Sequence, residues 1–137
     1  MALAPPVDAE IIQSPFGTIW VWCPVTGVLV TQIKGVLSAQ AAAKLAEIIR
    51  RLTAQFGRHE HFNDWEEMTN YDGEARTVMT STALSIRKDC EHVHLLVRSK
   101  AVALGVKVAS AVVPNLTSHV DRATFESALT ASIARHR

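Results

Sequence analysis

The chain has 137 residues, of which 48% are hydrophobic and 20% are charged, and its formal net charge is +1. This usage is typical of one globular domain and excludes a disordered or fibrous chain. A net charge so close to zero also argues against a protein that neutralises many nucleic-acid phosphates, so we expect no nucleic-acid partner.

The N-terminal residues 1–15 carry three prolines and show no hydrophobic periodicity. We therefore expect a flexible arm over 1–15, followed by a single domain over 16–137. The start lacks the basic leader and continuous apolar stretch of a signal peptide. The most apolar segment, 101–113, is interrupted by Lys107 and is shorter than the ~20 residues that cross a bilayer.

The two cysteines, Cys23 and Cys90, are far apart in the sequence, and neither belongs to a CxxC pair. Such spacing predicts neither a disulfide framework nor a zinc site built on cysteines. We expect both to be reduced, buried thiols in a cytoplasmic protein.

Two runs rich in β-branched and aromatic residues, 17–23 and 28–35, flank a short turn at 24–27 and predict a β-hairpin. A helix should follow, with Ser38 as its N-cap and Gly57 at its end. The apolar residues at helical spacing along it are Leu37, Ala41, Leu45, Ile48, Ile49, Leu52 and Phe56.

The next predicted strand is short, covering 61–65. The acidic and polar stretch EEMTNYDG at 66–73 should turn the chain into a second helix from Glu74 to about Lys88. The apolar residues of that helix are Ala75, Val78, Met79, Ala83 and Ile86.

The segment 92–97, HVHLLV, has the apolar run of a buried parallel strand, and it leads into a helix over 101–113 that is apolar on nearly every side. A last strand at 116–120 precedes a helix that Asp121 should cap. The order of elements is β, β, α, β, α, β, α, β, α. It predicts an α/β domain with a mainly parallel sheet of about five strands, an N-terminal hairpin and four helices on both faces.

Three segments, NDWEEMTNYDGEAR, HVHLLVRSKAVALGVKVAS and DRATFESAL, together with this order of elements, resemble the single-domain SpoIIAA-like group. The resemblance runs from about Thr18 to the C-terminus. It implies the STAS fold of bacterial anti-sigma-factor antagonists, a fold that is also likened to the CRAL-TRIO lipid-binding domains. Many members of the group have no characterised function.

The resemblance also implies a regulatory position. Phosphorylatable STAS proteins have an aspartate at the end of the third strand and, eight residues later, an aspartate followed by a phosphorylated serine. Here Asp64 and Asp72 keep the spacing, but Gly73 and Glu74 stand where the serine should be and have no hydroxyl. The charge of Glu74 suits a helix start, and Thr69 nearby offers a hydroxyl.

Two histidine pairs, His59 with His61 and His92 with His94, each place two imidazoles on one side of a strand. If the pairs converged beside Asp64, they could bind zinc or nickel; the alternative is that they are ordinary polar residues at strand ends. His59 and His61 could also serve acid–base chemistry with the acidic side chains Asp64, Glu66 and Glu67. Because no nucleophile, phosphate-binding or dinucleotide motif is present, we expect no enzyme, no cofactor and no catalytic residue.

The apolar helix over 101–113 is the main functional lead. We expect a hydrophobic or lipid-like ligand, or a membrane surface, to bind where this helix moves, with Arg98, Lys100 and Lys107 attracting an anionic group. The ligand-binding residues predicted from it and from the aromatic residues upstream are Trp65, Tyr71, Leu104, Val106, Val108 and Val112. Two alternatives remain open: the helix is buried by its neighbours or by a homodimer partner, or the domain binds a partner protein through this helix and the segment 72–75.

Overall fold

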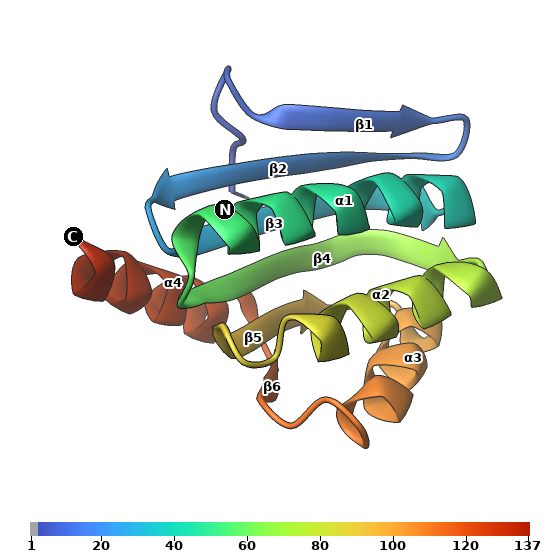
Figure 1. The fold of residues 1–137 in the computed structure, drawn as a ribbon. Coiled ribbons are helices and arrows are strands. Elements are labelled where there is room, and N and C mark those ends of the chain that lie inside the picture. The colour runs from blue at the N-terminus through green and yellow to red at the C-terminus, as the bar shows by residue number, and fades with distance from the viewer. Residues whose placement is uncertain (1–2) are drawn as a thin grey trace.

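The computed structural model describes residues 3–137, so Met1 and Ala2 of the predicted arm lie outside it. One six-stranded sheet has the order β1-β2-β3-β4-β5-β6 (Figure 1). The strands are β1 (Glu10–Ser14), β2 (Gly17–Val25), β3 (Val28–Leu37), β4 (His59–Tyr71), β5 (Cys90–Val97) and β6 (Leu116–His119). The helices are α1 (Ala39–Phe56), α2 (Gly73–Ser85), α3 (Lys100–Ser110) and α4 (Arg122–His136). The α/β architecture and the four helices confirm the prediction, whereas the sheet has one more strand than expected.

The additional strand is β1, which lies within the segment predicted as a flexible arm. It pairs antiparallel with β2, and Ile12 packs into the core. That part of the arm prediction is wrong, because backbone pairing with β2 holds a segment in which only Ile12 is buried. One buried side chain gives almost no periodic signal.

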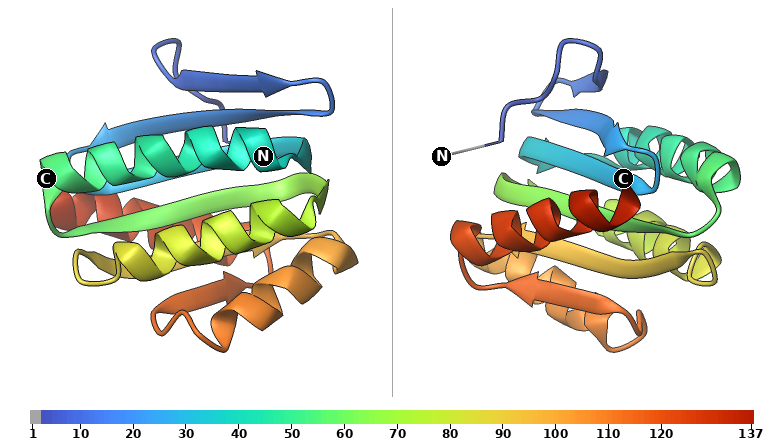
Figure 2. Two further views of the ribbon diagram at one scale, coloured as in Figure 1. Left: turned by 45° about the vertical axis from the view of Figure 1, so that its right-hand side comes forward. Right: turned by 90° about the vertical axis from the view of Figure 1, so that its left-hand side faces the viewer.

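Strands β1, β2 and β3 are antiparallel neighbours, and β3 to β6 run parallel. Helices α1, α2 and α3 cover one face of the sheet, and α4 covers the other (Figure 2). The predicted hairpin corresponds to β2 and β3. This arrangement is expected when parallel strands are joined by helical crossovers.

Strand β4 is much longer than the predicted 61–65. It pairs with β3 as far as Leu37↔Tyr71, so the acidic stretch that was expected to turn the chain continues as strand. Backbone hydrogen bonds to β3 do not depend on the side chains, and the residues from Glu66 to Tyr71 remain extended although most are polar. The turn into α2 is limited to Asp72.

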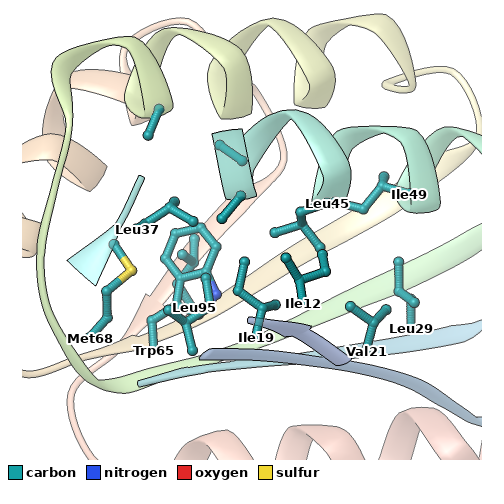
Figure 3. Close-up of a cluster of buried hydrophobic side chains, with 14 of the residues drawn as sticks. Ile12, Ile19, Val21, Leu29, Leu37, Leu45, Ile49, Trp65, Met68 and Leu95 are labelled. Atoms are coloured by element: carbon teal, nitrogen blue, oxygen red, sulfur yellow. The ribbon is translucent and has the colours of Figure 1, made fainter. Parts of the chain in front are cut away.

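Each face of the sheet has its own apolar core. Figure 3 shows part of the larger one, where side chains of β1 to β5 meet α1. The residues labelled there are Ile12, Ile19, Val21, Leu29, Leu37, Leu45, Ile49, Trp65, Met68 and Leu95. The smaller core joins Val28, Val30, Phe62 and Leu96 of the sheet to Phe125 and Leu129 of α4.

Helix α3 is less buried than its composition predicted. Ser99 caps its start by accepting a hydrogen bond from the backbone N–H of Val102, and the helix ends at Ser110, before the predicted Val113. Only Val102 and Gly105 within it are buried. No helix within residues 3–137 combines the length and apolar character needed to cross a membrane.

Candidate functional site

An apolar cavity of about 90 Å³ lies between the sheet and helices α2 and α3. Strands β4 and β5 form its floor, and the two helices form its walls. Its main lining residues are His61, Asn63, Trp65, Tyr71, Arg76, Met79, Ala83, Val93, Leu95, Val102, Val106 and Ala109. The cavity is partly open to solvent, and a concave apolar space with a few polar side chains is the usual form of a small-molecule site.

The six residues predicted to bind a ligand divide into two groups. Trp65, Tyr71 and Val106 line the cavity. The other three, Leu104, Val108 and Val112, do not line it and are exposed. Helix α3 therefore has an inner side that closes the cavity and an outer side that carries apolar side chains into solvent.

Gly105 allows the backbone of α3 to approach the Tyr71 side chain closely. A Cβ atom at this position would lie 2.5 Å from the hydroxyl oxygen of Tyr71, well inside van der Waals contact. Only glycine leaves room for this contact without displacing the tyrosine ring. The aromatic side chain and the helix backbone thus meet at the wall of the cavity.

A chain of buried hydrogen bonds runs beneath the cavity floor. The Trp65 indole N–H donates to Thr31 Oγ1 at 3.1 Å, and the Thr31 hydroxyl donates to Asn63 Oδ1 at 2.7 Å. The Asn63 amide in turn donates to the carbonyl of His94 at 3.2 Å. These bonds fix the Trp65 and Asn63 side chains, because breaking them would leave buried polar groups unsatisfied.

His59, His61 and Cys90 form a second, polar cluster on the same face of the sheet, and His61 also lines the cavity. Nε2 of His59 lies 2.7 Å from Nε2 of His61. Burial lowers the pKa of both histidines, that of His61 to about 3, helped by the neighbouring His59. Burial raises the pKa of the Cys90 thiol to about 12. All three groups are therefore neutral at pH 7.

The predicted convergence of four histidines is wrong. His92 and His94 lie on the opposite face, where the His94 ring stacks on Phe62 with centroids 4.2 Å apart. Successive residues of a strand point to alternate faces, and paired residues of neighbouring strands point to the same face. Because β4 pairs Glu60 with His92 and His61 with Val93, His92 lies on the face opposite to His61. A site made of both pairs cannot form in this sheet.

His94 belongs to a separate stack on the α4 face. Its Nδ1 lies 2.9 Å from His119 Nε2, and its Nε2 lies 3.5 Å from the buried Glu60 carboxylate. Burial lowers the pKa of His94 to about 4, and neighbouring His92 and His119 act in the same direction. Burial alone would raise the pKa of Glu60, but its ion pair with Arg135 outweighs this and lowers it.

Asp64 also faces α4, away from His59 and His61, so the predicted acid–base cluster does not form. Arg122 Nη2 donates to Asp64 Oδ1 at 2.7 Å and to Glu66 Oε1 at 3.0 Å, and Nη1 donates to Glu126 at 2.9 Å. Burial opposes the charge of Arg122, but these carboxylates outweigh burial and raise its pKa. Asp64 is a structural ion-pair partner here.

Of the four predicted regulatory positions, Asp64 lies apart from the other three. Asp72, Gly73 and Glu74 lie together at the start of α2, and Asp72 Oδ2 accepts a hydrogen bond from the backbone N–H of Ala39. Asp64 lies in the middle of β4, seven positions before its end at Tyr71, and points to the other face. It therefore does not stand beside the start of α2.

Sequence reasoning overlooked two residues of this region, Cys90 and Arg76. Cys90 is brought opposite His59 by the register of β4 with β5, next to an irregularity in that pairing. Arg76 is an exposed residue of α2 whose side chain reaches the cavity wall. Neither position carries a local sequence signal, although helical spacing does place Arg76 one turn before Met79 and Thr80.

The architecture is that of an α/β domain with a SpoIIAA-like fold, as comparisons with solved structures show. An uncharacterised protein of the DUF3478 family with a SpoIIAA-like fold, from Shewanella loihica PV-4, superposes with a TM-score of 0.58 and 11% identity. That alignment covers 99% of this chain and 100% of the other.

An anti-sigma factor antagonist from Mycobacterium paratuberculosis has a TM-score of 0.62 and 16% identity, covering 89% of this chain and 99% of its own. No protein-family model matches the sequence, and comparison with curated proteins gives no match. At these identities the similarity establishes the fold, which confirms the expectation from the sequence.

Proposed function

We propose that this protein is a non-enzymatic binding module whose ligand is an anionic amphiphile held between the sheet and helices α2 and α3. The observation that carries the proposal is the apolar cavity, which is lined by Trp65, Tyr71 and Val106. Burial of an apolar ligand surface there would supply the main driving force for binding.

The charge of the ligand follows from Arg76. Its side chain is exposed, yet it lines the cavity, and within residues 3–137 it makes no ion pair. A guanidinium at the edge of an apolar space pairs well with a carboxylate or phosphate head group. An anionic head with an apolar tail fits both features.

The size of the cavity implies movement. A cavity of roughly 150 Å³ accommodates benzene, so the present 90 Å³ admits only a few carbon atoms of a tail. A longer ligand needs more room, and displacement of α3, which is anchored to the core mainly by Val102 and Gly105, would provide it. The proposal thus keeps the movable helix expected from the sequence, which would act without a cofactor in a cytoplasmic protein.

Native mass spectrometry of freshly purified protein, followed by organic extraction, tests for a bound amphiphile. As a defined probe, decanoate is expected to bind the delipidated wild type. The Ala109→Leu variant, which fills the cavity from α3, should bind decanoate at least about tenfold more weakly, a loss of roughly 1.4 kcal/mol. Calorimetric titration measures the affinity.

Ala103→Leu is the matched control, because Ala103 is on the same helix but exposed. It should leave decanoate binding unchanged, whereas Arg76→Met should weaken it. Equal affinities for the wild type and Ala109→Leu, or no decanoate binding at all, would contradict the proposal.

A second candidate is a protein-interaction module that lacks the phosphorylatable serine. The specific observation in its favour is the exposed apolar side of α3, formed by Leu104 and Val108 and continued by Val112 in the turn after the helix, on a fold shared with an anti-sigma factor antagonist. A partner protein or a second copy of this chain would cover that side. The Val108→Asp variant should then lose the partner, or the dimer in light scattering, without losing decanoate binding.

A further inference from the structure

Three nearly fully buried side chains of metal-binding type meet on the α1 face of the sheet. His59, His61 and Cys90 are 0%, 4% and 3% exposed, and their ligand atoms all lie within 4.8 Å of one another. In the metal-free protein these groups bond to one another and to their neighbours: His59 Nε2 lies 2.7 Å from His61 Nε2 and 3.2 Å from Thr53 Oγ1, and the Cys90 thiol donates to the carbonyl of His92 at 3.5 Å. The cluster is the densest group of metal-binding side chains among residues 3–137.

The backbone determines how these side chains meet. His59 and His61 are two positions apart on β4, so their side chains emerge from the same face. The register of the two strands sets Cys90, the first residue of β5, directly opposite His59. Two adjacent strands at the centre of the sheet therefore hold all three donors.

His59 is already oriented as a metal ligand. Its Nδ1 lies 2.8 Å from the carbonyl oxygen of Gly57, and because a carbonyl only accepts, Nδ1 carries the proton. The lone pair is therefore on Nε2, the atom that faces His61. Metal-binding histidines commonly donate their other ring N–H to a carbonyl in this way.

Metal binding requires the three ligand atoms, which lie within 4.8 Å of one another, to move to tetrahedral separations. In tetrahedral zinc sites two nitrogen ligands are roughly 3.3 Å apart, and a nitrogen and a sulfur roughly 3.6 Å apart. The two Nε2 atoms are 2.7 Å apart, so the rings must separate by about 0.6 Å, and the Cys90 sulfur must approach the nitrogens by up to about 1.2 Å.

We propose that Nε2 of His59, Nε2 of His61 and Sγ of Cys90 form a Zn²⁺ site whose fourth position opens toward the apolar cavity. The His61 ring, which lines that cavity, then carries its proton on Nδ1, and the Cys90 thiol releases one proton to solvent on binding. Two imidazoles and one thiolate favour zinc over magnesium or calcium. The site uses one histidine pair and differs from the four-histidine arrangement that the sheet excludes, and it does not depend on the amphiphile.

Cobalt(II) alone is the probe, added to tag-free protein that has been treated with a chelator. One equivalent should give the intense visible bands of tetrahedral cobalt and a near-ultraviolet thiolate-to-cobalt band, and Zn²⁺ should abolish both by displacement. Cys90→Ala should lose the thiolate band and bind cobalt at least about tenfold more weakly. Cys23→Ala, which removes the other cysteine, is the matched control and should keep the band.

Circular dichroism checks that Cys90→Ala is folded. If it is not, X-ray absorption of the zinc-loaded wild type answers the question without a variant, because one sulfur at about 2.3 Å is expected in the coordination shell. The absence of stoichiometric cobalt binding, a thiolate band that persists in Cys90→Ala, or a shell of nitrogen and oxygen alone would each overturn the proposal.

Discussion

The Arg122→Met variant is expected to lose roughly 3 kcal/mol of unfolding free energy. Its guanidinium neutralises Asp64, whose side chain is only 2% exposed. In the variant, that carboxylate keeps one side-chain donor, the Gln32 amide at 3.1 Å. An uncompensated charge below the surface is costly, and the estimate is at the low end of the usual range because Arg122 itself retains some contact with water. Urea unfolding at pH 7 measures the loss.

Arg58→Met is the matched control, because Arg58 pairs with Glu91 on the surface. Exposed pairs contribute about 1 kcal/mol or less, so this variant should be nearly as stable as the wild type. Adding Asp64→Asn to Arg122→Met should recover part of the loss, since a neutral amide replaces the stranded charge. Equal stability losses in the Arg122 and Arg58 variants would refute the explanation.

Acid is expected to destabilise the protein through His94. Burial, together with neighbouring His92 and His119, lowers the pKa of His94 in the folded protein to about 4, whereas the nearby Glu60, itself paired with Arg135, acts in the opposite direction. The unfolded chain binds a proton near pH 6.5 and the folded chain does not. The lowered pKa therefore costs almost no stability above pH 6.5, and the cost grows as the pH falls toward 4, by about 2 kcal/mol between pH 7 and pH 5.

The measurement is the unfolding free energy at several pH values for the wild type and for His94→Gln, which cannot take up this proton. The wild-type curve should fall more steeply below pH 6.5 than the curve of the variant. Nuclear magnetic resonance of the His94 ring provides a direct check, because the ring should still be neutral at pH 5. Parallel stability curves, or a ring that titrates near pH 6.5, would contradict the prediction.

Most of the fold could be predicted because its signals are local. The hairpin and α1 were recognised from β-branched runs, a cap and an apolar stripe, which report directly on burial. The length of β4 could not be predicted, because residues 66–71 are held by backbone pairing with β3 and most of their side chains are polar. Strand β1 was missed for the related reason that Ile12 alone is buried.

Residues of the candidate site could be predicted only where an apolar or aromatic side chain is by itself a reason for the residue to face the cavity. Trp65, Tyr71 and Val106 are apolar or aromatic and do line the cavity. The same reasoning placed Leu104 there, but Leu104 is exposed, and the composition of a helix that is apolar on nearly every side does not reveal which side packs on the sheet. The meeting of Cys90 with His59 depends on strand register, which no spacing within one strand reveals.

The strand order of the sheet bears on how the protein is made. Because each strand pairs only with its neighbours in the sequence, the sheet can grow strand by strand as the chain leaves the ribosome, without waiting for distant segments. The face of the sheet that α4 covers is completed later. Its apolar side chains Val28, Val30 and Phe62 stay exposed until Phe125 and Leu129 of α4 have been synthesised. A nascent chain that pauses before α4 would therefore expose an apolar surface. Chaperone binding or aggregation is expected at this stage of synthesis.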